Sequence, residues 1–100
     1  MVQREDFFER VWELVAEIPY GRVATYGQLA DMLGYPRHAR LAGAAMHHAP
    51  QGLPCHRVVN SQGRTAPGWT GQRELLAAEG VRFRANGCVD LSASGWEEIG

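Results

Sequence analysis

The sequence predicts an α-rich α+β fold, a winged-helix-like helix-turn-helix domain with a small C-terminal β-hairpin. Three observations predict it: an amphipathic first helix, two short helices joined by a tight glycine turn, and two extended segments, residues 81–83 and 88–91, that flank Asn86-Gly87. The chain has 100 residues, 45% of them hydrophobic. This length predicts one domain, residues 1–100, with one modest core.

The first helix is predicted from the Asp6 region to Ile18. Asp6 can cap it, and Glu9 three residues later completes a capping box. The apolar residues recur at helical spacing and predict one buried face; they are Phe7, Phe8, Val11, Leu14, Val15 and Ile18. Pro19-Tyr20-Gly21 ends the helix. We expect this helix to be scaffold.

Two shorter helices follow. An extended segment, residues 22–24, precedes a helix over about 26–33, which Thr25 caps and Gly34 ends. A tight turn then leads into a third helix over about 37–47.

The third helix has small side chains in its centre, namely Ala39, Ala42, Gly43, Ala44 and Ala45. A glycine inside a helix costs about 0.5–1 kcal/mol relative to alanine. Gly43 therefore predicts the close approach of another backbone, either of this protein or of DNA.

The rest of the chain is expected to be mostly irregular. Residues 54–59 begin irregular and end as a strand, and residues 64–70 form a mobile loop. Thr70 is predicted to cap a last helix over 71–79, which Gly80 closes.

The charges are divided among three segments. All ten basic residues are arginines, and the net charge of the chain is −1. Residues 1–19 and 74–100 each carry −3, whereas residues 20–73 carry +5 and all four histidines. The basic middle can present a face to phosphate, or the acidic helices can neutralise it across the fold.

The sequence also excludes several classes of protein. No apolar run reaches 18 residues, which argues against a membrane span, and no signal peptide is visible. Two cysteines without a leader predict a reducing cytoplasm and no disulfide framework. No cofactor motif is present, so we expect no cofactor.

Cys55 is the candidate nucleophile. It lies in the basic segment beside His56, and positive charge or a helix N-terminus lowers the pKa of a thiol. A histidine can supply a base, and Glu79 is the candidate acid that fixes its tautomer. A buried, inert cysteine is the alternative. A metal site of Cys55, His56, Cys88 and one of His47 or His48 lacks supporting spacing, so we expect none.

Four stretches of the sequence, covering about residues 7–83 in order, resemble the DNA-binding domain of O6-alkylguanine-DNA alkyltransferases. They are Ile18-Pro19-Tyr20-Gly21-Arg22-Val23-Ala24-Thr25-Tyr26-Gly27-Gln28-Leu29-Ala30; Pro36-Arg37-His38-Ala39-Arg40 with Gly43-Ala44-Ala45-Met46; Pro54-Cys55-His56-Arg57-Val58-Val59; and Leu75-Leu76-Ala77-Ala78-Glu79-Gly80. The Pro-Cys-His-Arg run is similar to the family's active-site signature.

The resemblance implies roles in DNA binding. Tyr26 would press on the phosphate 3′ of the lesion, and Arg40 would replace the extruded base in the stack. The third helix would enter the minor groove; the implied contacts are Tyr26, Arg37, Ala39, Arg40, Gly43 and Arg57. Purely structural roles are the alternatives. Tyr26 can pack beside Phe8 or Trp12, and Arg40 can pair with Asp31 on the surface. Arg37 and Arg57 can be solvated charges.

The resemblance also implies the chemistry. Cys55 would accept the alkyl group, His56 would act through a water, and Glu79 would lie behind His56. The lesion pocket would be bordered by Tyr26, Pro54, Cys55, Val58 and Trp69.

Three departures from the family point to its alkyltransferase-like members. The match starts at the first helix of the DNA-binding domain, so no N-terminal domain is expected. Ala49 replaces an asparagine that helps brace the active-site turn, and Pro67-Gly68-Trp69-Thr70-Gly71 replaces a Tyr-Ser-Gly-Gly loop. Alkyltransferase-like proteins bind alkylated guanine without repairing it, but they usually lack the reactive cysteine that this sequence keeps.

These features predict a cytoplasmic, nucleoid-associated monomer that binds double-stranded DNA containing O6-alkylguanine and hands it to nucleotide excision repair proteins. Two alternatives stay open. One is a stoichiometric methyltransferase that uses Cys55, and the other is a helix-turn-helix regulator of undamaged DNA.

Overall fold

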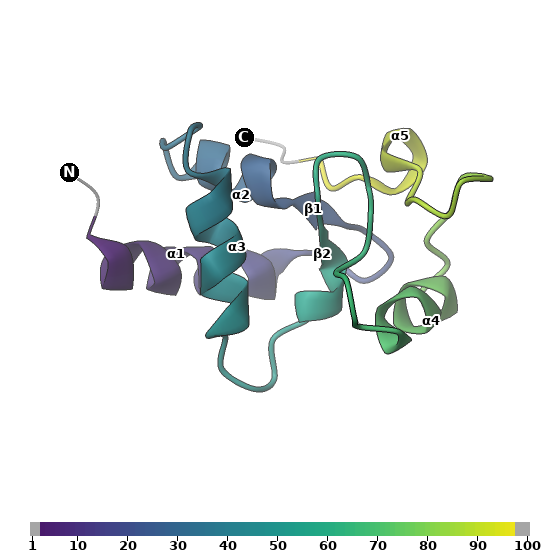
Figure 1. The fold of residues 1–100 in the computed structure, drawn as a ribbon, viewed down its shortest axis with the longest axis horizontal. Helices are drawn as coiled ribbons and strands as arrows, with labels where there is room; N and C mark the ends of the chain where they lie inside the picture. Colours follow the sequence, from purple (N-terminus) through teal and green to yellow (C-terminus); the bar gives the residue numbers. More distant parts are fainter. Residues whose placement is uncertain (1–2, 98–100) are drawn as a thin grey trace.

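The computed structural model describes residues 3–97. Three helices, α1 (Arg4–Glu17), α2 (Tyr26–Met32) and α3 (Ala39–His47), pack against one another on one side of a short ladder. On its other side lie α4 (Gly71–Ala78) and α5 (Leu91–Ser94) (Figure 1). The fold is therefore helix-rich, as the sequence predicts.

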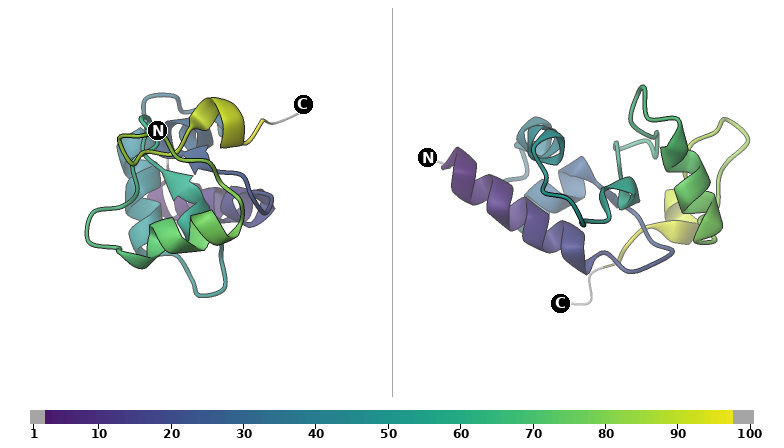
Figure 2. Two further views of the ribbon diagram at one scale, coloured as in Figure 1. Left: turned by 90° about the vertical axis from the view of Figure 1, so that its right-hand side faces the viewer. Right: turned by 90° about the horizontal axis from the view of Figure 1, so that it is seen from below.

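The ladder joins the two halves of the molecule. Strand β1 (Ala24–Thr25) pairs in parallel with β2 (Val58–Val59), and Ala24 lies opposite Val58. The connection between these strands contains α2 and α3, and Figure 2 shows the ladder from two further sides. The sequence predicts extended backbone in both places but not that the two segments pair.

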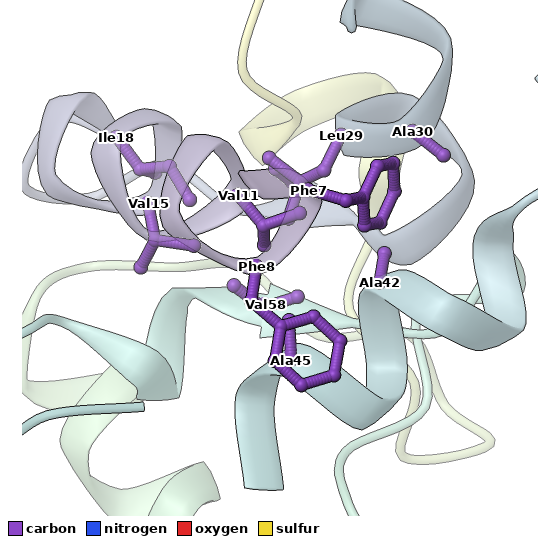
Figure 3. Packing of buried hydrophobic residues seen from close by; sticks show 11 residues of the cluster. Phe7, Phe8, Val11, Val15, Ile18, Leu29, Ala30, Ala42, Ala45 and Val58 are labelled. Carbon is purple, nitrogen blue, oxygen red and sulfur yellow. The ribbon is translucent and has the colours of Figure 1, made fainter. Parts of the chain in front are cut away.

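The main core forms around the apolar face of α1. Phe7, Val11 and Val15 are buried and contact residues of α2 and α3, as predicted (Figure 3). Burying a side chain of this size stabilises the fold by about 1.5–3 kcal/mol. The core also includes Phe8, Ile18, Ala24, Leu29, Ala30, Ala42, Ala45 and Val58.

The predicted start of α1 is wrong. The helix begins at Arg4, its N-cap Gln3 makes no side-chain cap bond, and Asp6 lies inside the first turn. The expected capping box of Asp6 and Glu9 is therefore absent. In the first turn, the negative charges of Glu5 and Asp6 favour the helix through its dipole.

The two shorter helices follow the prediction more closely. The Thr25 hydroxyl accepts a hydrogen bond from the Gln28 N–H at 3.0 Å, which confirms the predicted cap of α2. Gly34 has φ +88°, which places the residue after α2 in the left-handed region. Helix α3 begins at Ala39 instead of Arg37, which lies in the preceding turn.

The C-terminal region departs most from the prediction. The expected hairpin is reduced to one antiparallel bridge between Phe83 and Val89. The chain then turns into α5, because Asp90 accepts hydrogen bonds from the Ser92 and Ala93 N–H groups and caps that helix. The predicted Thr70 cap of α4 is also wrong, since Thr70 is itself helical and makes no side-chain cap bond.

A second, smaller cluster holds α4 to the ladder. It consists of Val23, Val59, Leu76, Val81 and Val89. Val23 also exchanges backbone hydrogen bonds with the end of α5, to Ser94 at 2.9 Å and from Trp96 at 2.7 Å. Within residues 3–97, no helix has both the length and the apolar character that a membrane crossing requires.

Candidate functional site

A cavity of about 400 Å³ lies between α3 and the loop that precedes α4. Helix α3 contributes Gly43, Met46 and His47 to its wall, and the loop contributes residues 66–69. The remaining lining residues are Tyr26, Cys55, Val58 and Gln72.

Four of the five residues predicted to border this pocket do so, namely Tyr26, Cys55, Val58 and Trp69. Pro54 does not line it; its carbonyl instead accepts the Arg57 N–H at 3.0 Å. Met46 and Gln72 were missed by the sequence analysis. Met46 stands inside the motif that resembles the recognition helix, but a lone methionine in an apolar helix carries no signal of its own.

The cavity gives Cys55 access to solvent, so the thiol is not fully buried, and its reactivity stays a prediction. Cys55 is half-buried and begins the short 3₁₀ helix η1 (Cys55–Arg57). Burial raises the pKa of the Cys55 thiol, and a hydrogen bond from the Cys55 backbone N–H to the sulfur offsets this only in part. The expectation that the basic segment lowers this pKa is therefore wrong, and the resting group is a neutral thiol.

His56 and Glu79 meet as the sequence analysis expects. His56 Nε2 lies 2.6 Å from Glu79 Oε2. Burial alone raises the pKa of Glu79, but hydrogen bonds from Arg57, the Gly21 N–H and His56 outweigh it and hold the pKa at about 2. Glu79 is thus a carboxylate that accepts, so Nε2 of His56 donates and Nδ1 is left as the acceptor of the ring.

The Arg57 side chain forms its hydrogen bonds with other groups of the protein. Its guanidinium donates to Glu79 from Nε at 3.0 Å and from Nη2 at 3.0 Å, and from Nη1 to the Ile18 carbonyl at 2.8 Å. It also lies 5.6 Å from the centre of the Tyr20 ring. The side chain is 16% exposed. Its charge is committed to Glu79, while the expected contact of Arg57 with DNA stays a prediction.

A shallow groove runs along α3 next to the cavity. It is lined by Tyr26, Ala39, Arg40, Gly43, Ala44 and His47, so it brings together four of the residues predicted to contact DNA. Arg37 is exposed but lies outside this groove, in the turn before α3.

Arg40 is exposed in this groove. The ion pairs found between residues 3 and 97 all involve Glu79, so the alternative pairing of Arg40 with Asp31 is wrong. Among the described residues, the ion pairs formed by the basic middle, residues 20–73, all go to Glu79, and no described acidic side chain forms an ion pair with Arg40.

Tyr26 links the groove to the cavity, because it lines both. It begins α2 and also packs against the main core, which also includes Phe8 and is contacted by Trp12. The two interpretations of Tyr26 are therefore compatible. Burial raises the pKa of the phenol, so Tyr26 stays a neutral hydrogen-bond donor.

Gly43 has no packing partner that demands a glycine. A Cβ built on Gly43 would meet nothing within 4 Å. The helix thus carries the cost of an interior glycine without a benefit inside the protein.

Cys88 is buried and unpaired. In the part of the chain that the structure describes, no three His, Cys, Asp or Glu side chains are grouped to hold a metal ion.

Comparisons with known proteins agree with this geometry. Residues 6–81 match the family model described as 6-O-methylguanine DNA methyltransferase, DNA binding domain. The chain is 45% identical over 101 residues to the DNA base-flipping protein of Escherichia coli, which covers 95% of this chain and 78% of that protein. It is 40% identical over 89 residues to alkyltransferase-like protein 1 of Schizosaccharomyces pombe, which covers 82% of each.

Solved structures give the same result. The crystal structure of S. pombe Atl1 in complex with damaged DNA containing O6-carboxymethylguanine superposes with a TM-score of 0.81 at 34% identity. That match covers 98% of this chain and 100% of the other. Mycobacterium tuberculosis OGT in complex with DNA gives a TM-score of 0.66 at 41% identity, covering 74% of this chain and 49% of that chain. This chain thus spans about half of such a methyltransferase.

Proposed function

Because the chain belongs to the O6-methylguanine DNA methyltransferase family through its DNA-binding domain, we propose that it binds duplex DNA and takes an O6-alkylguanine into the cavity beside Cys55. The observation that carries this proposal is the position of that cavity. It shares Tyr26, Gly43 and His47 with the α3 groove, and its lining also includes Cys55 and Trp69. A base inside a duplex is out of reach, so it must be rotated out at a cost of a few kcal/mol.

In this proposal α2, the following turn and α3 act as the helix-turn-helix of a winged-helix-like domain, and α3 enters the minor groove. The minor groove of B-DNA is about 6 Å wide and excludes an ordinary helix unless its side chains are small or the groove is widened. Gly43 supports this arrangement, since the open space over it is left for an external backbone.

Arg40 and Tyr26 would stabilise the flipped state. Arg40 is exposed and unpaired at the start of α3, where its guanidinium can fill the gap that the extruded base leaves. Tyr26 stands at the boundary between groove and cavity, where its phenol can contact the phosphate of the rotating nucleotide.

The protein would then serve as a lesion sensor. The relatives named DNA base-flipping protein and alkyltransferase-like protein match most of this chain and most of their own length. We propose that it acts as a monomer and that the marked lesion passes to nucleotide excision repair proteins.

Alkyl transfer to Cys55 is the second candidate, favoured by the position of the thiol at the cavity and by the His56–Glu79 pair. His56 Nδ1, acting through a water, would take the thiol proton as the sulfur attacks the alkyl carbon. The S–C bond forms, the C–O6 bond breaks, and guanine leaves and regains the proton. A thioether has no route back to the thiol, so each molecule would react once.

Three measurements test these functions. The affinity of the protein for a duplex with one O6-methylguanine should exceed its affinity for the same duplex with guanine, and a fluorescent base analogue next to the lesion should report unstacking. Equal affinity for both duplexes, with sequence preference, would instead identify a regulator of undamaged DNA. Mass spectrometry after incubation with the methylated duplex separates the two candidates. A gain of one methyl group by the original protein, with no gain by Cys55→Ser, shows transfer to Cys55.

A further inference from the structure

Gln72 is a fully buried polar side chain in the first turn of α4, with 0% exposure. Of the described residues, Ser94 is the other buried polar one. Burying an amide costs free energy unless its hydrogen bonds are made, and an apolar residue would fill the same space without that cost. The use of a glutamine here therefore calls for a reason beyond packing.

The Gln72 amide is bonded on both sides. Its Oε1 accepts the Ala66 N–H at 2.7 Å. Its Nε2 donates to the His56 carbonyl at 3.0 Å and to the Val58 carbonyl at 2.9 Å. Both amide hydrogens and the oxygen are thus used, and the side chain connects two segments that face each other across the cavity.

One of these segments is the loop wall of the cavity, residues 66–69. Its other hydrogen bonds are local: the Trp69 N–H donates to the Ala66 carbonyl, and the Trp69 carbonyl accepts from the Gln72 N–H. Among the described residues, one hydrogen bond joins residues 65–68 to a helix or strand. It is the bond from the Ala66 N–H to Oε1 of Gln72 in α4. The position of this wall therefore depends on the Gln72 side chain.

The other segment carries the thiol. The His56 and Val58 carbonyls lie on η1 and β2, directly after Cys55. A single planar amide thus sets the separation between the thiol segment and the loop that carries Trp69.

We propose that Gln72 is a positioning residue that fixes the width of the lesion cavity, and with it the discrimination between damaged and intact guanine. The inference rests on the proposed function, because it assumes that the Ala66–Trp69 loop contacts the O6-alkylguanine in the cavity. Gln72 lines the lesion cavity but not the α3 groove, so its loss should weaken the binding of the damaged duplex more than the binding of the intact duplex.

Two variants test the proposal. Gln72→Met keeps the length and flexibility of the side chain and removes all three hydrogen bonds. Ala66→Pro removes the N–H donor of the loop, also fixes the φ angle of that residue, and leaves the Gln72 bonds to His56 and Val58. Leu76→Val is the matched control, because it weakens the buried face of the same helix and leaves all three hydrogen bonds of the Gln72 side chain in place.

The unfolding midpoint and the affinity ratio for O6-methylguanine over guanine duplexes are measured for every variant. The exchange rate of the Ala66 amide proton is measured by NMR for the original protein, Gln72→Met and Leu76→Val, because a proline at position 66 has no amide proton. We expect Gln72→Met and Ala66→Pro to lower that ratio by at least about tenfold, equivalent to about 1.4 kcal/mol. Gln72→Met should also make the Ala66 amide exchange freely. Leu76→Val should lower the midpoint while the ratio and the exchange rate stay unchanged.

The proposal is overturned if folded Gln72→Met retains both the protected Ala66 amide and the full affinity ratio. It is equally overturned if Leu76→Val loses the ratio to the same extent, since general loosening would then explain the effect. If the unmodified protein itself does not distinguish the two duplexes, the proposed function fails. The Ala66 exchange rate still reports whether Gln72 holds the loop.

Discussion

His56 Nε2 lies 2.6 Å from Glu79 Oε2 at the junction of η1 and α4. The other carboxylate oxygen accepts the Gly21 N–H at 2.8 Å, and Arg57 donates to both oxygens. One carboxylate thus ties the thiol segment to the end of α4 and to the turn before β1.

The bonds to Glu79 predict a pH-dependent stability. Because the folded pKa of Glu79 is lowered from 4.5 to about 2, its contribution is fully present above pH 4.5 and is lost as the pH falls towards 2. Glu79→Gln should therefore destabilise the protein at pH 7, on the order of 3 kcal/mol, since it leaves Arg57 without its charged partner. Urea unfolding of both proteins at pH 7 and pH 3 measures this.

The difference in unfolding free energy between the two proteins should shrink as the pH falls, and a constant difference would contradict the assignment. Glu74→Gln is the control, because Glu74 is exposed on the same helix and outside the ion pairs described here. A surface substitution of that kind changes stability by about 0.5 kcal/mol or less.

Gly43→Ala should separate stability from DNA binding. The added methyl group meets nothing within 4 Å, so the helix should gain about 0.5–1 kcal/mol. The same methyl group fills the space over α3, so affinity for both intact and damaged duplexes should fall. Thermal unfolding and fluorescence anisotropy measure the two effects. A variant that is more stable and binds DNA as well as the original protein would show that α3 does not approach the duplex there.

Arg40→Ala and Arg37→Ala should have different effects on the affinity for damaged and intact DNA. Arg40 lines the groove beside the cavity, so its loss should weaken binding to the damaged duplex far more than to the intact one. Arg37 lies outside the groove, so its loss should weaken both equally and reduce the slope of log K against log salt by about 0.9. Titrations at several salt concentrations distinguish them. Equal loss on both duplexes for Arg40→Ala would refute its role in replacing the base.

The sequence predicts the helices because their signals are local. The apolar stripe of α1 and the Thr25 cap depend on residues a few positions apart, and both are present in the structure. The α5 cap by Asp90 was missed because a four-residue helix has no periodicity to detect. The parallel pairing of β1 with β2 was missed because two-residue strands carry no pattern of their own.

The sequence predicted the site residues whose role follows from the side-chain type itself. It missed the residues whose role depends on hydrogen bonds to distant segments. Cys55 and Trp69 border the cavity as expected. Arg57 was assigned to DNA because a basic residue in a basic segment gives no sign of a distant carboxylate. Gln72 gave no signal for a similar reason, since its three partners lie in segments that only the fold brings together.

The raised pKa of Cys55 leads to a last prediction, about thiol reactivity. Burial holds the pKa above its usual 9.0, and the thiolate is the reactive form. Alkylation of Cys55 by iodoacetamide should therefore be slow at pH 7 and should still be accelerating beyond pH 9. Mass spectrometry, with Cys55→Ser to exclude reaction at Cys88, follows the rate. A rate that levels off by pH 8 would show that the free protein already holds a thiolate. Continued acceleration would show that the free protein holds Cys55 as a neutral thiol, the form from which His56 takes the proton in the proposed transfer.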